Sequence, residues 1–395
     1  MMNETYLRGF KIRLFPTKEQ EELMWKHVNA CRFIWNKCKE IRDTTYKNDG
    51  KRVGFNDIMH KLLDMKQEYP FLKEVSNATL QVTVIDLYIA YERFFKKISN
   101  YPKYKSKKKS VASFPLRPDI HATYIKNDMY IKIPTIGLVA YRFDYRKDYH
   151  IVSYRLRNPR ISYVNGKWIL GVALECEKQT QESTYKRMGI DLGIKYLATV
   201  SFGHNRECEE VQFININKDI RIKKLESKIK HLNRKFSRQY RANKKFIDEN
   251  NCYTHNMIKT KKKIQKAYYR IHCIRTNYMH ELSCYLVNYK RPSCITMETL
   301  IVKHLVKNRH LSKVIQDSSF NAFTNMIRYK CERTTCTGFM QVPRNYPSSK
   351  RCSKCGNIKT NLKLGDRIYV CNVCGNNIDR DINAARNLRD YEYNK

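Results

Sequence analysis

Four cysteines near the C-terminus constrain the fold more than any other feature of this sequence. Cys352-Ser-Lys-Cys355 and Cys371-Asn-Val-Cys374 are separated by fifteen residues, and a glycine directly follows each pair. Zinc binds four thiolates in tetrahedral geometry, and each C-x2-C turn supplies two of them. A redox-active dithiol would need only one such turn. The spacing therefore predicts a structural zinc ribbon in which no coordination position remains for a catalytic water.

The other ten of the 14 cysteines, such as Cys31, Cys176 and Cys284, stand singly in apolar or helical stretches. This distribution is typical of a reducing compartment rather than of a disulfide scaffold. No run of about 18 apolar residues occurs, and the first residues lack the order of a secretion signal. We expect a cytoplasmic protein, associated with the nucleoid when it binds DNA, and no contact with a membrane.

The charge of the chain indicates its partner. Lys and Arg number 77 against 37 Asp and Glu, so the formal net charge is +40, with a pI near 9.7. A hydrophobic fraction of 42% excludes disorder as the main state, and 395 residues are enough for two to four domains. A folded chain with this charge repels itself unless a polyanion is present, so nucleic acid is the expected partner.

The N-terminal part predicts a strand, two helices and then a β-rich module. Tyr6 to Phe15 alternates and ends at a proline, and Thr17 with Gln20 forms a capping box for a helix over 18–48. A second helix begins near Asn77. From about 110 to 177 the period changes to two, with strands at Tyr124–Ile133 and Leu138–Phe143 and an Asn165-Gly166 hairpin turn. The polar, aperiodic stretch Glu177–Lys186 predicts a domain boundary.

The C-terminal part begins with a strand-like run over Met188–Ser201 and a strand near Val211–Ile216, followed by a basic helical hairpin over 221–287. The seam of the hairpin is predicted from apolar residues at helical spacing, namely Ile222, Leu225, Ile229, Leu232 and Phe236 with Ile264, Tyr268, Ile271, Tyr278, Leu282 and Tyr285. The other faces carry eleven cations, Lys223, Lys224, Lys228, Lys230, Arg234, Lys235, Arg238, Lys261, Lys262, Lys263 and Arg270. They form either a solvated face or, as the excess of one sign favours, a phosphate-binding face.

Three acids that are far apart in the sequence, Asp191, Glu298 and Asp381, lie in or next to segments that are expected to be buried. Asp191 and Glu298 each interrupt an apolar strand, and Asp381 lies at the start of a helix. A carboxylate in an apolar strand is costly unless it meets a cation or a donor. Each acid alone is better explained as a strand-end carboxylate that caps a loop. Together they predict a magnesium site suited to two-metal cleavage of phosphodiesters.

The order of these motifs resembles the transposon-encoded TnpB (OrfB) family, which is related to type V CRISPR effectors. The resemblance rests on the following segments: Phe10–Pro16, Tyr101–Lys105, Gly189–Lys195, Ile295–Glu298, Leu311–Asp317 with Phe323, Tyr346–Cys352 with the ribbon, and Asp379–Leu388. It covers nearly the whole chain.

The resemblance implies an α/β multidomain protein with an RNase H-like RuvC nuclease domain, into which a four-cysteine zinc ribbon is inserted. A β-barrel wedge domain with a helical recognition insertion precedes it. The implied bounds are 1–16 and 99–178 for the wedge, 17–98 for the recognition region, 179–187 for a linker, 188–347 and 379–395 for the nuclease domain, and 348–378 for the ribbon.

The resemblance further implies an RNA-guided DNA endonuclease that cuts beside a short flanking motif. Asp191, Glu298 and Asp381 become the catalytic triad and the ligands of Mg²⁺ or Mn²⁺, and Cys352, Cys355, Cys371 and Cys374 hold Zn²⁺. The implied partners are a guide RNA from the transposon end and double-stranded target DNA. A transposase encoded by the same element is a further implied partner, without direct contact.

One residue departs from the family pattern, and two other functions stay open. Thr299 follows Glu298 where the family commonly has a second acid, which we expect to alter hydrogen bonding around the site. One alternative is a nuclease-inactive, RNA-guided DNA-binding repressor, although all three acids are present. The other is a transposase that joins DNA strands.

Overall fold

The computed structural model describes residues 4–107, 110–117, 124–125, 129–143, 151–184, 186–204, 207–300, 318–362 and 365–391. The chain divides into two compact units, Met1–Glu177 and Lys178–Lys395. Among the described helices, none is both long and apolar enough to cross a membrane.

The first unit is built on an antiparallel seven-stranded sheet in the order β2-β6-β7-β1-β5-β4-β3. The strands are β1 Thr5–Phe15, β2 Ser113–Pro115, β3 Tyr124–Ile125, β4 Tyr130–Ile133, β5 Gly137–Arg142, β6 Ile151–Val164 and β7 Lys167–Glu177. The expected hairpin turn is confirmed, because Asn165 and Gly166 both have positive φ (51° and 80°) between β6 and β7. The single strand expected over Tyr124–Ile133 is instead β3 and β4, separated by Met129 and by 126–128, which lie outside the described residues.

Four helical segments accompany this sheet, α1 Lys18–Asp49, α2 Phe55–Glu68, the 3-10 helix η1 Pro70–Glu74 and α3 Asn77–Phe95. The predicted capping box at Thr17 and Gln20 is confirmed. Met24, Val28 and Cys31 on α1 pack into the core of the sheet, whereas Ile34 and Cys38 pack against α2, η1 and α3. One long helix therefore contributes to two hydrophobic cores.

The second unit begins with a segment that is attached to its own domain. Gln179 pairs with Thr334 in a parallel bridge, and Thr184 donates its backbone N–H to the carbonyl of Arg291. The polar stretch after β7 thus makes backbone hydrogen bonds with the second unit instead of running free.

A five-stranded mixed sheet forms the centre of the second unit, in the order β10-β9-β8-β11-β12. Its strands are β8 Arg187–Leu192, β9 Tyr196–His204, β10 Glu207–Ile214, β11 Cys294–Met297 and β12 Gly338–Gln341. The run over 188–201 that we read as one strand is two strands, because the chain reverses at Gly193–Lys195 and β9 pairs antiparallel with β8. β11 and β12 are parallel to β8 and come from distant parts of the sequence.

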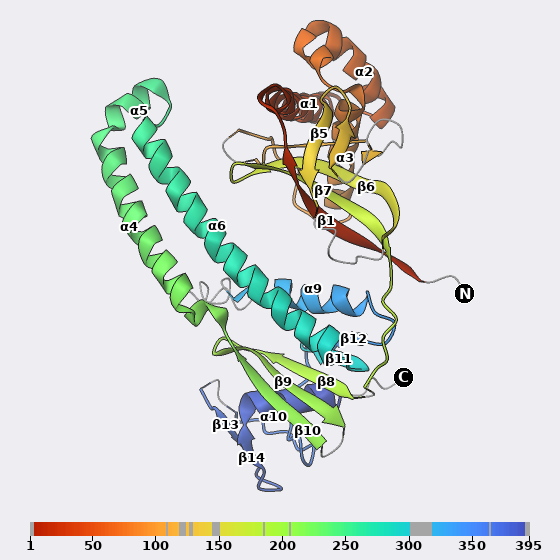
Figure 1. Cartoon of the computed structure of the whole chain (residues 1–395), viewed down its shortest axis with the longest axis vertical. Coiled ribbons are helices and arrows are strands. Elements are labelled where there is room, and N and C mark those ends of the chain that lie inside the picture. The colour runs from red at the N-terminus through yellow and green to blue at the C-terminus, as the bar shows by residue number, and fades with distance from the viewer. Residues whose placement is uncertain are drawn as a thin grey trace. The chain divides into compact units, whose positions relative to one another are not determined.

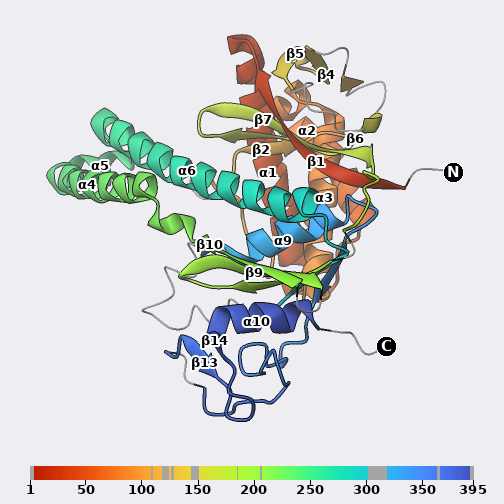
Figure 2. The same cartoon turned by 60° about the horizontal axis from the view of Figure 1, so that its bottom comes forward.

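Helices cover both faces of this sheet (Figure 2). The end of α6 His255–Cys284, the π-helical turn Tyr285–Tyr289 and α9 Phe320–Cys331 pack their apolar side chains on one face. The short helix α10 Arg380–Arg389 packs on β8 and β9 from the other face. Residues 311–317, which contributed to the family resemblance, lie outside the described part of the chain.

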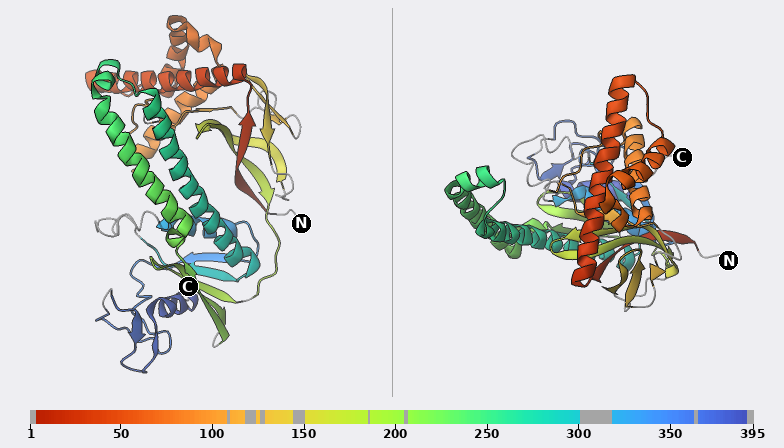
Figure 3. Two further views of the ribbon diagram at one scale, coloured as in Figure 1. Left: turned by 60° about the vertical axis from the view of Figure 1, so that its left-hand side comes forward. Right: turned by 90° about the horizontal axis from the view of Figure 1, so that it is seen from above.

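The basic hairpin consists of α4 Ile220–Ala242, the short α5 Lys244–Asn250 and α6, with α4 and α6 side by side (Figures 1 and 3). Ile222, Ile229, Ala267 and Ile271 form its buried seam. Tyr268, which we placed in the seam, is 56% exposed, because the smaller Ala267 faces α4 in its place.

Gly189 lets α10 lie directly on the backbone of β8. A Cβ atom at this position would be 2.1 Å from the carbonyl oxygen of Ala385 and 2.2 Å from the backbone nitrogen of Arg389. Both of these atoms belong to the backbone of α10 and cannot rotate away. Only glycine therefore permits this contact, and Asp191 follows two positions later on the same strand.

We predict that Gly189→Ala destabilises the second unit by about 1–3 kcal/mol or more, because overpacking must displace α10 from the sheet. The matched control is Gly9→Ala in β1, where a Cβ meets nothing within 4 Å. Thermal unfolding of both variants, followed by circular dichroism, measures the difference. An equal and small change in the two variants would show that α10 can move at little cost.

Candidate metal centres

The four cysteines meet in the ribbon formed around β13 Ile368–Val370 and β14 Asn377–Asp379. Their sulfur atoms all lie within 4.8 Å of one another, and the Cys352–Cys374 and Cys355–Cys371 sulfurs are each 3.6 Å apart. Four thiolates bonded to one zinc at about 2.3 Å would be about 3.8 Å apart. The arrangement fits a closed tetrahedral zinc site, as the spacing predicted.

The two halves of the cluster use the same backbone turn. The N–H of Gly356 donates to the carbonyl of Cys352 (2.9 Å), and the N–H of Gly375 donates to that of Cys371 (3.1 Å). Both glycines have positive φ, 78° and 67°. Backbone N–H groups of Cys374 and Val373 that point at the Cys371 sulfur lower the pKa of this thiol to about 6. At Cys371 the turn thus favours the thiolate that a metal requires.

Two asparagines on α10 connect this helix to the first cysteine turn. The side chain of Asn383 donates to the carbonyl of Arg351 (2.7 Å) and accepts from the N–H of Ser353 (2.9 Å). Asn387 donates to the carbonyls of Ser348 (2.8 Å) and Arg351 (2.6 Å). Both amides are buried, at 0% and 4% exposure, so the ribbon and α10 are held together by satisfied polar contacts.

The structure brings the three predicted acids together. Met297 of β11 pairs in parallel with Ile190 of β8, so Glu298 and Asp191 follow side by side on neighbouring strands. Asp381 lies in the first turn of α10, which packs on β8. Three segments that are more than eighty residues apart from one another therefore place their carboxylates at one end of the sheet.

The electrostatics of the three acids reflect this proximity. Burial raises the pKa of Asp191 well above its usual value, and the charges of Glu298 and Asp381 raise it further. Burial also raises the pKa of Glu298 to about 7, although the backbone N–H of Leu192 and the charge of Arg380 act in the opposite direction. The pKa of Asp381 is raised by burial and by Asp379. Three neighbouring carboxyl groups with raised pKa values bind either protons or a cation, because both reduce the repulsion between their charges.

Asp379 has a different task from Asp381. Its carboxylate caps α10 by accepting hydrogen bonds from the N–H groups of Asp381 (2.9 Å) and Ile382 (3.2 Å).

The three acids are spaced more widely than the four cysteines. Among the described residues, only the cysteines have ligand atoms close enough together to hold a single ion. The residue after Glu298, Thr299, donates its hydroxyl to the carbonyl of Val342 (2.6 Å).

The eleven cations of the basic hairpin that we predicted for a phosphate-binding face are all solvent-exposed. The eleven residues predicted for a phosphate-binding face lie on α4 and α6, away from the buried seam. They are available to a polyanion along both helices.

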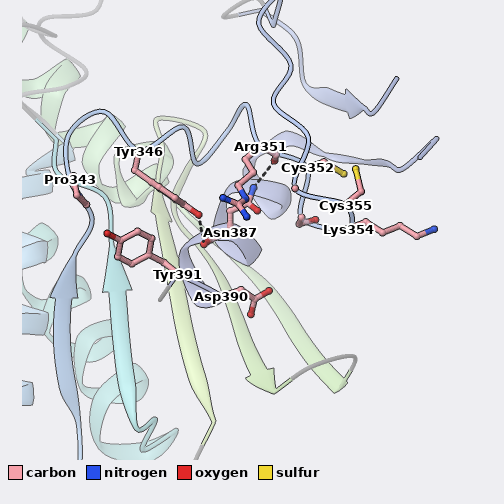
Figure 4. A pocket seen from close by; sticks show the side chains of 11 residues that line it. Pro343, Tyr346, Arg351, Cys352, Lys354, Cys355, Asn387, Asp390 and Tyr391 are labelled. Carbon is pink, nitrogen blue, oxygen red and sulfur yellow. Dashed lines mark hydrogen bonds between the residues drawn. The ribbon is translucent and has the colours of Figure 1, made fainter. Parts of the chain in front are cut away.

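A cavity of about 830 Å³ lies between the first cysteine turn and the C-terminal end of α10 (Figure 4). Tyr346 donates to the carbonyl of Asn387 (3.1 Å) and packs edge-to-face on Tyr391, while Arg351 and Lys354 supply positive charge. The cavity is at the opposite end of α10 from Asp381, about 13 Å along the helix.

Sequence reasoning missed four residues of this region. Gly189, Asn383 and Asn387 position α10, and Arg380 lowers the pKa of all three acids. The spacing of four between Asn383 and Asn387 is a signal that could have been found, since it places both amides on one helix face.

We predict that Cys371→Ser lowers both the zinc content and the unfolding temperature, because a three-thiolate site loses its closed geometry. Cys252→Ser, at an exposed cysteine outside the cluster, is the matched control and should keep one zinc per chain. Elemental analysis and thermal unfolding of the purified variants measure both effects. Full zinc occupancy in Cys371→Ser would contradict the ligand assignment.

Comparison with known proteins identifies three matching family models. The OrfB model described as "Probable transposase" matches residues 171–309, and the model "Cas12f1-like, TNB domain" matches residues 320–388. A model described as "Helix-turn-helix domain", also of the OrfB group, matches residues 1–51. In this structure that segment contains strand β1 and the single long helix α1 rather than two helices joined by a turn.

Relatives of similar length match this chain over nearly all of its residues. The "Putative RNA-guided DNA endonuclease" of Streptomyces pristinaespiralis is 29% identical over 98% of this chain and 90% of that protein. The "Putative RNA-guided DNA endonuclease InsQ" of Escherichia coli K12 is 26% identical over 97% and 91%. A solved structure titled "Cryo-EM structure of the Cas12f1-sgRNA-target DNA complex" aligns over 98% of this chain and 99% of that chain at 14% identity, with a TM-score of 0.35.

The two OrfB models and the relatives indicate the same family as the sequence motifs do. The relatives match over about nine-tenths of their own length, 90% and 91%. The resemblance to the TnpB (OrfB) family that the sequence motifs predicted is therefore confirmed.

Proposed function

We propose that this protein is an RNA-guided DNA endonuclease that cleaves phosphodiester bonds beside a short flanking motif. The observation that carries the proposal is the convergence of Asp191, Glu298 and Asp381 at one end of the central sheet. Two relatives of similar length carry the name of this activity. The net charge of +40 supports RNA and DNA as partners.

The proposed nuclease domain is RuvC-like, with an RNase H-like fold. Three antiparallel strands followed by two parallel ones, in the order β10-β9-β8-β11-β12, support it, as does the position of the ribbon between β12 and α10. For the first unit we propose a wedge domain from 1–16 and 99–178, with 17–98 as the recognition region. In the described residues, the edge strands β2 and β3 are not paired with each other, so closure into a barrel stays a prediction.

The three acids would hold Mg²⁺ or Mn²⁺. Their oxygen donors are the type that these ions prefer, and their raised pKa values show that the folded protein disfavours the bare charges. Such ions, held by these residues, would supply the Lewis acidity for activation of water and for stabilisation of the leaving oxygen of a phosphodiester. Because the three acids are not spaced to share one ion as the cysteines are, substrate phosphate would complete the metal site.

The cationic side chains of the protein would bind and position the nucleic acid. The charge of Arg380 reaches all three acids, so this residue would offset negative charge beside the cleaved phosphate. The exposed cations of α4 and α6 would contact backbone phosphates. Base pairing with the guide RNA would then select the target.

A transposase is the second candidate, because the OrfB model that matches residues 171–309 is described by that word. Strand joining can use the same carboxylates and ions as hydrolysis. Analysis of the DNA products separates the two, since a transposase joins ends whereas an endonuclease leaves them free. Guide-dependent binding without any cut would instead indicate a repressor.

We predict that Asp191→Asn abolishes cleavage of a plasmid library that carries the guide-matched target beside randomised bases. The change keeps the size of the side chain but removes the metal-binding charge, so binding of the guide RNA should not change. Wild-type protein should cut only with both guide RNA and Mg²⁺, and EDTA should stop it. Sequencing of the cut ends measures activity and the flanking motif together.

The control for this experiment is Asp248→Asn, at an exposed acid of α5 in the same unit, which should cut normally. Wild-type activity in Asp191→Asn would overturn the triad assignment.

We also predict that Mg²⁺ stabilises the folded wild type and that this effect depends on pH. A folded-state pKa of about 7 for Glu298, above its usual 4.5, means that stability from this group is full below about pH 4.5 and is lost as the pH rises to 7. Burial and the charges of Glu298 and Asp381 raise the pKa of Asp191 in the same direction, so above pH 7 Asp191→Asn in EDTA should melt at a higher temperature than the wild type. Adding Mg²⁺ should raise the melting temperature of the wild type but not that of the variant; equal responses would contradict a site at these acids.

A further inference from the structure

A second cavity, of about 240 Å³, lies in the first unit and has no part in the site described above. It opens between the last turns of α1, the segment before α2, the end of α3 and the chain that follows α3. Its lining residues are Arg42, Asp43, Tyr46, Arg52, Tyr91, Phe94, Phe95 and Tyr101. Five of these eight are aromatic and two are arginines.

The two arginines lie over aromatic rings. The guanidinium carbon of Arg42 is 4.1 Å from the ring centre of Tyr91 and 4.6 Å from that of Tyr88, and Arg52 lies 4.8 Å from that of Phe95. These cation–π contacts hold flat, positively charged groups against flat, apolar ones. The cavity wall is thus a set of planar surfaces rather than a flexible aliphatic pocket.

The base of the cavity is held in place by Asp43. One oxygen of its carboxylate accepts the hydroxyls of Tyr91 (2.7 Å) and Tyr101 (2.6 Å), and the other pairs with Lys39. The ring of Tyr101 packs edge-to-face on Phe94, at 5.1 Å between ring centres. Because its only acid is already paired with a lysine and two hydroxyls, the cavity does not favour a cationic ligand.

The rim of the cavity exposes aromatic surface. The exposed fractions are 57% for Tyr46, 51% for Phe95 and 45% for Tyr101. The Nη1 atom of Arg42, in the same cavity lining, is buried from solvent and has no hydrogen-bond partner among the described residues. Buried donors in native structures normally find an acceptor, so this N–H points to a ligand atom that accepts a hydrogen bond.

The chemistry that fits these features is a flat heterocycle with an acceptor at its edge. The cavity is smaller than the roughly 300–1,000 Å³ of sites for drug-sized ligands, so it suits a single ring system. Aromatic surfaces combined with arginines are the usual means by which proteins stack single bases. The edges of nucleobases carry the carbonyl and ring-nitrogen acceptors that an arginine N–H seeks.

We propose that this cavity binds one unpaired nucleobase of the nucleic acid that the protein carries. The inference rests on the proposed function only in taking nucleic acid as the partner. A base within a duplex is covered on both faces by its neighbours, so the ligand must be an unstacked nucleotide in a loop, a bulge or a single strand. The same base chemistry can come from guide RNA or from DNA.

Photocrosslinking of the full-length protein tests the location. The probes are a short single strand of RNA with 4-thiouridine, the DNA strand of the same sequence with 4-thiothymidine, and a blunt duplex. Mass spectrometry should find crosslinks from a single strand in the peptides that contain Tyr46, Phe95 or Tyr101, and none of these from the duplex. The strand that gives them identifies the source of the base.

Affinity measurements test the chemistry. At high salt, where phosphate contacts weaken, Phe95→Ala should reduce binding of oligouridylate at least about fivefold and leave binding of an abasic strand of equal length unchanged. Phe95→Trp, which keeps an aromatic ring, should bind oligouridylate as the wild type does. Leu63→Ala, which truncates an exposed side chain of α2 outside the cavity, is the control for loss of apolar surface. Arg52→Gln should weaken binding of the same strand, compared with Lys51→Gln next to it.

The outcomes separate the two proposals. Crosslinks confined to other parts of the chain, or equal losses for oligouridylate and the abasic strand, would overturn the base site while RNA binding stands. Failure of every single strand to bind would overturn both. Loss of base binding in Phe95→Ala with Mg²⁺-dependent cleavage still measurable would confirm a site distinct from the triad.

Discussion

The contact between the backbone of α10 and the backbone of β8 at Gly189 is the constraint on which the rest of the second unit depends. It sets the height of α10 above the sheet and thereby places Asp381 near Asp191. The same helix is bound through Asn383 and Asn387 to the first cysteine turn. A single close approach therefore connects the sheet, the acids and the ribbon.

Through these hydrogen bonds the ribbon supports α10, and this support does not depend on contact with nucleic acid. A metal ion held by the four cysteines would order the segment whose carbonyls accept hydrogen bonds from the two asparagine side chains. Because folding of a small metal site depends on its ion, loss of zinc should loosen the support of α10. The charges of Glu298 and Asp381 raise the pKa of Asp191, so the same helix also carries one of the acids that repel each other while ionised.

Local patterns were enough for several elements but not for their pairing. The capped helix α1, the Asn165-Gly166 hairpin and the cysteine cluster follow from neighbouring residues, and the structure confirms them. The region 188–201 was misread, because its reversal at Gly193 lacks a strong turn dipeptide and the strands on both sides are apolar. Tyr268 was misplaced for a related reason, since helical spacing alone cannot distinguish it from Ala267 as the residue that faces the neighbouring helix.

The sequence by itself determined which residue types carry the chemistry, because ligand spacing within one turn and a lone acid in an apolar strand are local properties. Only the tertiary structure decided that Asp191 and Glu298 are neighbours, through the parallel register of β8 and β11. It also distinguished the capping role of Asp379 from the position of Asp381. The aromatic cavity between α1 and α3 has no sequence signature, because its walls come from four separate segments. Contacts between distant segments depend on packing and burial, which no local pattern encodes.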